Sequence, residues 1–234
     1  MNTRWAFVRQ TIFATSQPIE DSRVLRDAYS LPAGFTDPML LEHGIADETV
    51  PIGPDQYLEL LSPAGEASPL HGWLAKHGGH GGYGIAVQVP DMASIRERVV
   101  DRGIKILIEQ DAFGHPIMQL NPRQVGGLLL DLDEMPDRSA WFWDDITPGP
   151  SSGAVVDAVL DIEIGVSDPD GFAALWAHLL DVDQPTPRSV DLGTRITFVE
   201  AETAGVVAVT LRINGDRDVA DRQQFGVMFH HRSG

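Results

Sequence analysis

The chain has 234 residues, 43% of them hydrophobic, which is enough for one large domain or two small ones with a substantial core. Its 34 acidic and 17 basic residues give a formal charge of −17, which disfavours nucleic acid and anionic membrane surfaces as partners. The sequence has no membrane-spanning apolar stretch, no signal-peptide pattern at the N-terminus and no cysteine. We therefore expect a cytoplasmic protein in which oxygen and imidazole are the only metal ligands.

Three segments share a strand, a proline and then an amphipathic helix: "TIFATSQPIEDSRVLRDAY", "GIAVQVPDMASIRERVVDRG" and "DIEIGVSDPDGFAALWAHLL". The prolines are Pro18, Pro90 and Pro169, and proline suits a helix start because its φ is fixed and its missing N–H costs nothing there. Three strands are predicted after each of the first two helices, so the repeating unit is βαβββ. The predicted strands are 39–42, 49–52 and 56–61 in the first unit, and 105–109, 116–120 and 128–132 in the second.

A run of turn-forming residues at 148–153 separates the second repeat from the third. We predict an N-terminal domain at 1–137, a linker at 138–153 and a C-terminal domain at 154–234. After the third repeat the sequence predicts strands without a fourth helix, so the fourth unit is expected to be truncated. The aromatic residues of the linker are expected to pack between the domains, because buried aromatic side chains usually fill cores and interfaces. They are Trp141, Phe142 and Trp143.

One carboxylate interrupts the apolar stretch "QYLELLSP". Tyr57, Glu59 and Leu61 point to one face of an extended chain, and the intervening leucines point to the other. Burying an unpaired carboxylate costs several kcal/mol or raises its pKa. Glu59 is therefore expected to be solvated, paired or bound to a ligand.

Three motifs, "GPDQYLELLSP", "GGYGIAVQVPDMASIRERVVDRGIKI" and "LNPRQVGGLLLDLDE", occur in an order and spacing that resembles the vicinal oxygen chelate superfamily. This family includes glyoxalase I, methylmalonyl-CoA epimerase, extradiol dioxygenases and bleomycin-binding proteins. The resemblance is clear over residues 5–134 and weak over 155–231. It implies an α+β fold of tandem βαβββ modules, whose curved, half-barrel mixed sheets surround a cavity with metal ligands on the first and last strands of each module.

The resemblance carries the family's ligand positions to Gln10, Glu59, Gly84 and Asp131. The family usually has histidine where Gln10 and Gly84 stand, and glycine has no side chain that can bind a metal. The remaining amide and two carboxylates suit a hard cation such as Mg²⁺ or Mn²⁺, and they lack the two histidines that non-haem Fe requires. The two alternatives are that the protein binds a divalent metal (Mg, Mn or Fe) or that it has no cofactor.

The resemblance implies an enzyme of the lyase, isomerase or dioxygenase type that acts on a small molecule, as a monomer or homodimer. Glu59 and Asp131 are its candidate catalytic residues, because two close carboxylates raise one pKa and create a usable base. Gln10, Tyr83 and His115 are the candidate substrate-binding residues. The functional alternative is a metal-free, non-catalytic protein that sequesters a small apolar or cationic molecule, of the bleomycin-resistance type. The structural alternative is that the carboxylates only accept hydrogen bonds within the sheet.

The C-terminal half offers a second set of possible metal ligands. When the last repeats are aligned with the first, Asp161, Glu200 and His230 fall opposite Gln10, Glu59 and Asp131. These three residues are the alternative metal set.

The stretch "HGWLAKHGGHGG" contains three histidines, His71, His77 and His80. Their spacing does not place them on one helix face, and the glycines around them favour a flexible, solvated connector between modules.

Overall fold

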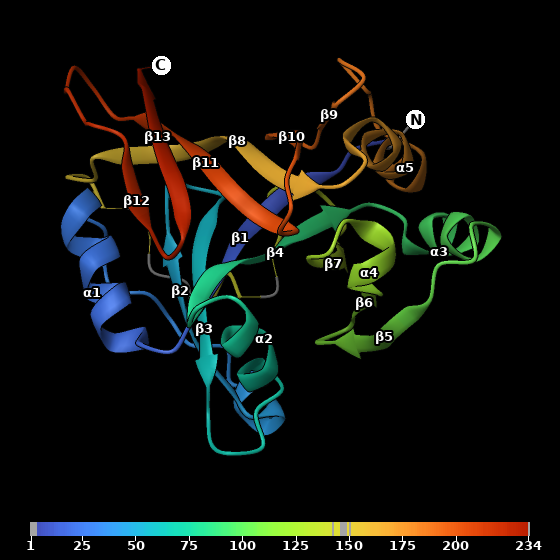
Figure 1. The fold of residues 1–234 in the computed structure, drawn as a ribbon, viewed down its shortest axis with the longest axis horizontal. Helices are drawn as coiled ribbons and strands as arrows, with labels where there is room; N and C mark the ends of the chain where they lie inside the picture. Colours follow the sequence, from blue (N-terminus) through green and yellow to red (C-terminus); the bar gives the residue numbers. More distant parts are fainter. Residues whose placement is uncertain (1–3, 142, 146–148, 150, 234) are drawn as a thin grey trace. The chain divides into compact units, whose positions relative to one another are not determined.

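The structure, a computed structural model, describes residues 4–141, 143–145, 149 and 151–233 (Figure 1). Its many strands and few helices confirm the predicted α+β class. The elements in chain order are β1 (Phe7–Thr15), α1 (Pro18–Tyr29), η1 (Leu40–His43), β2 (Ile45–Pro51), β3 (Tyr57–Pro63), α2 (Leu70–Lys76), β4 (His80–Val89), α3 (Met92–Asp101), β5 (Ile106–Ala112), β6 (His115–Leu120), α4 (Pro122–Val125), β7 (Leu129–Glu134), β8 (Val156–Val166), α5 (Pro169–Leu180), β9 (Ser189–Asp191), β10 (Arg195–Glu200), β11 (Gly205–Ile213), β12 (Arg222–Gln224) and β13 (Val227–Ser233).

The chain folds into two compact units. Unit A contains the described residues of 1–9, 84–145 and 161–206, and unit B contains those of 10–83, 146–160 and 207–234. Each unit therefore draws on both sides of the predicted linker. The division of the sequence into domains at 1–137 and 154–234 stays a prediction, and Phe142, Pro148 and Pro150 lie outside the described residues.

The first predicted repeat lies in unit B, where β1 pairs in parallel with β3, and β3 pairs in antiparallel with β2. Helix α1 begins at Pro18, as predicted, and acidic residues in its first turn suit the positive end of the helix dipole. Its buried side chains include Leu25 and Tyr29, and Ser22 donates a hydrogen bond to Glu48 of β2. Helix α1 thus covers the face of the sheet to which Glu48 points.

The segment predicted as a strand at 39–42 lies instead in the 3-10 helix η1 and the turn before it. The Asp37 side chain accepts a hydrogen bond from the backbone N–H of Met39 at 2.7 Å. Such a local side-chain contact offers the backbone an alternative to strand pairing. The position beside β2 is taken by Phe35, which forms an antiparallel bridge with Thr49.

The histidine-rich stretch contains a helix, α2, where the sequence predicted a flexible connector. The ring of Trp73 stacks on that of His77 with 3.8 Å between centroids, and Tyr83 meets Trp73 edge-on at 5.2 Å. The side chains of Leu70 and Leu74 are buried. The histidine spacing did not reveal this helix because leucines, and not histidines, form its buried face.

Unit A contains the second and third predicted repeats. Strand β4 pairs in parallel with β7, which is followed in antiparallel by β6 and β5; β8 pairs in parallel with β10, which is antiparallel to β9. Helix α5 begins at Pro169, as predicted, and the side chain of Asp168 caps its first turn. Trp176 of α5 packs against Phe198 of β10 and donates a hydrogen bond to the carbonyl of Val125 at 2.8 Å.

The described part of the predicted aromatic cluster packs within unit A. The guanidinium of Arg9 lies over the Trp141 ring, 5.6 Å from its centroid, and Trp143 meets Phe113 edge-on at 4.8 Å. Both indoles are buried, as expected of packing residues. Their place between two sequence domains stays a prediction.

The last strands of unit B follow the third repeat, and the truncation of the fourth repeat stays a prediction. Strand β13 pairs in parallel with β11 and in antiparallel with β12, and the described residues 205–233 contain no helix. Phe13 of β1 packs against Phe225 and Phe229, so the core of unit B combines the first and last strands of the chain. No helix in the described ranges is long and apolar enough to cross a membrane.

Candidate functional site

One face of the unit B sheet carries three buried polar side chains, Asp47, Thr49 and Glu59. Strand pairing places Tyr57 opposite Gln10, and Glu59 opposite both Ile12 and Thr49. Paired residues point to the same side of a sheet, so these side chains share the face that lies opposite α1. We call the set Gln10, Asp47, Thr49, Tyr57 and Glu59 the polar face of unit B.

Glu59 is buried and paired, which answers the question that its sequence raises. It is 5% exposed, and the amide nitrogen of Gln10 donates a hydrogen bond to its Oε2 at 3.1 Å. A hydrogen bond to a carboxylate is stronger than one between neutral groups and offsets part of the cost of desolvating the charge. The structure thus brings together two of the predicted site residues, Gln10 and Glu59.

Asp47 is a second buried carboxylate on this face, and sequence reasoning missed it. It lies opposite Leu61, diagonal to Glu59, a relation that puts Cα atoms about 7–8 Å apart. Its two oxygens accept hydrogen bonds from the backbone N–H of Asp37 at 3.0 and 3.1 Å, and Thr49 Oγ1 donates to Oδ2 at 3.4 Å. Burial raises the pKa of Asp47 to about 7.

The pKa of Asp47 gives the polar face a group that can take up or release a proton near neutral pH. The sequence signal was the alternation of Asp47 and Thr49 in "IADETV", which places both on one strand face. The prediction missed it because it began this strand at Thr49, whereas β2 begins at Ile45.

Asp131 belongs to unit A, on the face of β7 that carries Asp133. It is half-buried and lies opposite Ala86 of β4 and Gln119 of β6. His115 lies on the same face of β6 as Gln119, but four residues away, which corresponds to about 14 Å along a strand. The two predicted residues of unit A therefore share a face without forming a pair.

Tyr83 packs against helix α2 of unit B through its contact with Trp73. Burial raises the pKa of its hydroxyl. Substrate contacts by Tyr83 and His115 stay predictions.

The residues at the family's ligand positions do not complete its metal site. A Cβ atom added to Gly84 would lie 2.4 Å from the carbonyl oxygen of Leu129, so a larger residue fits there only if the backbone moves. The Gln10 side chain directs its N–H group, and not its amide oxygen, toward the Glu59 carboxylate. The one Gln10 atom that could bind a metal therefore does not face Glu59. Among the described residues, no three Asp, Glu or His side chains are placed to hold one metal ion.

The alternative metal set of the C-terminal half stays a prediction, and the structure spreads its members along the strands. In the pairing of β8 with β10, Asp161 lies opposite Arg195, and Glu200 opposite Val166. The two carboxylates are therefore five residues apart along parallel strands, which is about 16 Å. His230 instead pairs with Asp221, with 2.7 Å between Nδ1 and Oδ2.

Comparison with known proteins gives relatives with named activities. No family model matches the chain. The ethylmalonyl-CoA/methylmalonyl-CoA epimerase of Cereibacter sphaeroides is 31% identical over 98 residues, which are 40% of this chain and 72% of that protein. The mitochondrial methylmalonyl-CoA epimerase of Homo sapiens is 32% identical over 98 residues, 41% of this chain, and the chain spans only 55% of its length.

Solved structures share the fold. A hypothetical protein from Staphylococcus aureus matches 97% of this chain and 99% of its own, with a TM-score of 0.68 and 10% identity. A methylmalonyl-CoA epimerase in complex with methylmalonyl-CoA and NH4⁺ matches 58% of this chain and 99% of its own, with a TM-score of 0.50 and 23% identity. Because the 31% identity covers 72% of the Cereibacter protein and the fold agrees, the chain belongs to the vicinal oxygen chelate superfamily.

Proposed function

We propose that the chain is an isomerase of the epimerase type, which inverts the carbon atom next to the carbonyl of a CoA thioester. The observation that carries this proposal is the pair of buried carboxylates on the polar face of unit B, Glu59 held by Gln10 and Asp47 with a pKa of about 7. The named relatives are enzymes of this class, which favours it over the non-catalytic binder.

Inversion at such a carbon needs one group that removes a proton and one that returns it on the other side. In the proposed reaction, the Glu59 carboxylate takes the proton from the carbon, and the electron pair of the broken C–H bond moves toward the carbonyl oxygen. The protonated carboxyl of Asp47 then donates a proton to the opposite face of the same carbon. The reaction consumes nothing, because the two carboxyl groups exchange their protonation states and solvent resets them.

The two carboxylates suit these roles for different reasons. The Gln10 hydrogen bond fixes the orientation of the Glu59 carboxylate, as required of a positioned base. The burial of Asp47 keeps a sizeable protonated fraction at neutral pH, as required of an acid. The catalytic role of Asp131 of unit A, the other carboxylate that the sequence singled out, stays a prediction.

Proton exchange with solvent tests the proposal directly. Methylmalonyl-CoA is incubated with the protein in D₂O, and loss of the signal of the proton next to the carbonyl is followed by NMR. We expect exchange with the wild-type chain and a loss of about 10²–10⁴-fold in Glu59→Gln. The matched control is Glu42→Gln, which changes an exposed carboxylate before β2 and is expected to exchange at the wild-type rate. Binding of the thioester without any exchange would instead identify a binding protein.

A further inference from the structure

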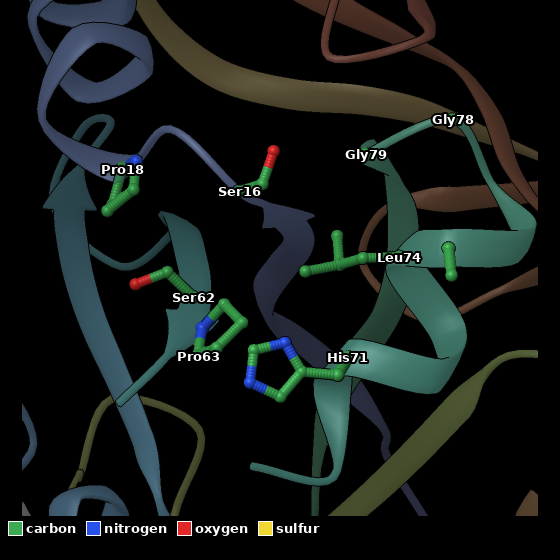
Figure 2. Close-up of a pocket in the computed structure, with 9 residues that line it drawn as sticks. Ser16, Pro18, Ser62, Pro63, His71, Leu74, Gly78 and Gly79 are labelled. Atoms are coloured by element: carbon green, nitrogen blue, oxygen red, sulfur yellow. The ribbon is translucent and has the colours of Figure 1, made fainter. Parts of the chain in front are cut away.

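A pocket of about 580 Å³ opens in unit B beyond the ends of β1 and β3 (Figure 2). These strands are parallel and paired, so their C-terminal ends lie side by side. The volume falls within the roughly 300–1,000 Å³ of small-molecule sites. The lining residues come from five places, the turn after β1, the start of α1, the end of β3, helix α2 and the glycine-rich approach to β4: Ser16, Pro18, Ser62, Pro63, His71, Leu74, Ala75, Gly78 and Gly79.

None of these nine lining residues is acidic, lysine or arginine, on a chain with 34 acidic and 17 basic residues. A phosphate or an ammonium group would therefore meet no countercharge in the pocket. Two prolines, Pro18 and Pro63, and the side chain of Leu74 provide apolar surface (Figure 2). The pocket is thus suited to a neutral group with apolar faces.

The polar atoms of the pocket include hydrogen-bond acceptors. His71 Nε2 lies 2.9 Å from the carbonyl oxygen of Gly65, and a carbonyl can only accept, so Nε2 carries the proton. In the neutral imidazole, Nδ1 is then an acceptor. Ser62 donates its hydroxyl proton to the carbonyl of Ala46 at 3.4 Å, which leaves its oxygen lone pairs to accept. A fitting occupant therefore brings N–H donors as well as apolar faces.

We propose that this pocket binds an adenine ring, which combines a flat apolar surface with an exocyclic amino group that can donate to His71. The inference deepens the proposed function and rests on it in one respect, since a CoA thioester carries such a ring at the end away from the reacting carbon. Glu59 and Pro63 lie on the same strand, four residues apart, which corresponds to about 13 Å. A long flexible substrate can therefore extend from the polar face to the pocket.

Calorimetric titration with adenosine tests the pocket without any need for turnover. Ala75 is an exposed lining residue on α2, so Ala75→Trp fills the pocket from its rim, and His71→Phe keeps a ring but removes the acceptor. We expect each change to weaken adenosine binding at least tenfold. The control Ala220→Trp places the same indole on an exposed site outside the pocket and is expected to bind like the wild-type chain. Absence of adenosine binding, or binding that neither pocket variant weakens, would overturn the inference.

Kinetics with two substrates distinguish an adenine ring that belongs to the substrate from one that belongs to a separate nucleotide. If the ring belongs to the substrate, Ala75→Trp raises the KM for methylmalonyl-CoA at least tenfold and leaves that for the methylmalonyl ester of pantetheine unchanged, and adenosine competes only with the CoA ester. If a separate nucleotide occupies the pocket, adenosine binds but both esters keep their KM in the variant. A protein that turns over neither ester contradicts the proposed function, while the adenosine titration still decides the pocket.

Discussion

The strand face of unit A that carries Gln88 and the polar face of unit B both lie on a parallel strand pair, but their buried polar groups are satisfied in different ways. In unit A, Arg9 is 1% exposed and donates hydrogen bonds to Gln88 Oε1 at 2.7 Å and to the carbonyl of Arg138 at 2.9 Å. Gln88 in turn donates to the carbonyl of Ala140 at 2.9 Å. These contacts fix the chain segment after β7 to the sheet. A buried polar network of this kind specifies a structure.

In unit B the corresponding face holds two carboxylates, and no lysine or arginine belongs to the set that defines it. Glu59 has an amide partner, and Asp47 has backbone and hydroxyl donors. Neutral donors leave the pKa of Asp47 close to neutrality, whereas a neighbouring arginine would lower it. In unit A a buried cation thus meets neutral acceptors, whereas in unit B buried carboxylates meet neutral donors, and only the second arrangement suits the proposed proton transfer.

The largest expected effect is on the rate of epimerisation, and it distinguishes Asp47 of unit B from Asp131 of unit A. In Asp47→Asn the amide cannot return a proton, so we expect the epimerisation rate to fall about 10²–10⁴-fold. Asp131→Asn in unit A is the matched variant, and we expect a loss of less than tenfold. The rates of methylmalonyl-CoA inversion are followed by chiral chromatography of the hydrolysed acid. The reverse order, with Asp131→Asn the slower variant, would contradict the assignment of Asp47 as the acid.

The next effect concerns the stability of unit A. In Arg9→Leu the side-chain oxygen of Gln88 and the carbonyl of Arg138 lose their buried donor. Each unsatisfied acceptor costs about 1–3 kcal/mol, so we expect the free energy of unfolding to fall by about 2–6 kcal/mol. Urea denaturation followed by tryptophan fluorescence measures the loss. The control is Arg96→Leu, which removes an exposed arginine of α3 paired with Glu109 and is expected to cost less than about 1 kcal/mol. Equal losses in the two variants would show that the Arg9 network is not a stabilising feature.

Part of this architecture could be predicted from the sequence and part could not. The prolines predicted where α1 and α5 begin, because helix starts are set by local backbone geometry. The alternation of side chains along a strand likewise predicted that Glu59 and Tyr57 share a face. The structure adds that Gln10 lies opposite Tyr57 and that its side chain donates a hydrogen bond to Glu59. The prediction of a strand at 39–42 was wrong because a side-chain hydrogen bond of Asp37 competes with strand pairing. The spacing of hydrophobic residues gives no sign of such a contact.

The missed site residue has a different cause. Asp47 depends on the exact start of β2, and strand boundaries are the least reliable part of a sequence prediction. Aligning repeats one by one also ignores strand register, on which the spacing of the alternative metal set depends. Register sets Asp161 and Glu200 at opposite ends of one pairing. The sequence predicted which side chains lie along a strand. It did not predict which residues of neighbouring strands lie opposite each other.

A smaller effect follows from the pKa of Asp47 and concerns stability against pH. Its pKa is about 7 in the folded chain and ordinarily 3.8, so between these values the folded state binds the proton more tightly than the unfolded chain. The contribution of Asp47 therefore makes the free energy of unfolding fall as pH rises through this window, by up to about 4 kcal/mol. Urea denaturation between pH 4 and 8 is expected to show a shallower fall in Asp47→Asn. Identical slopes in both proteins would show that Asp47 titrates normally and weaken its assignment as the acid.

The smallest expected effect uses ionic strength to separate the epimerase from a binder of cations. A CoA ester is a polyanion, and the chain carries a formal charge of −17, so long-range repulsion opposes their encounter. Added salt screens this repulsion over about 10 Å at 0.1 M, and we expect the KM for methylmalonyl-CoA to fall a few-fold between low and physiological salt. The uncharged pantetheine portion contributes nothing to this trend, so the smaller pantetheine ester should show a weaker salt dependence. A KM that rises with salt would mean that local cations near the site outweigh the charge of the whole chain. Arginine or lysine side chains, which the neutral pocket of unit B lacks, would then bind the CoA phosphates.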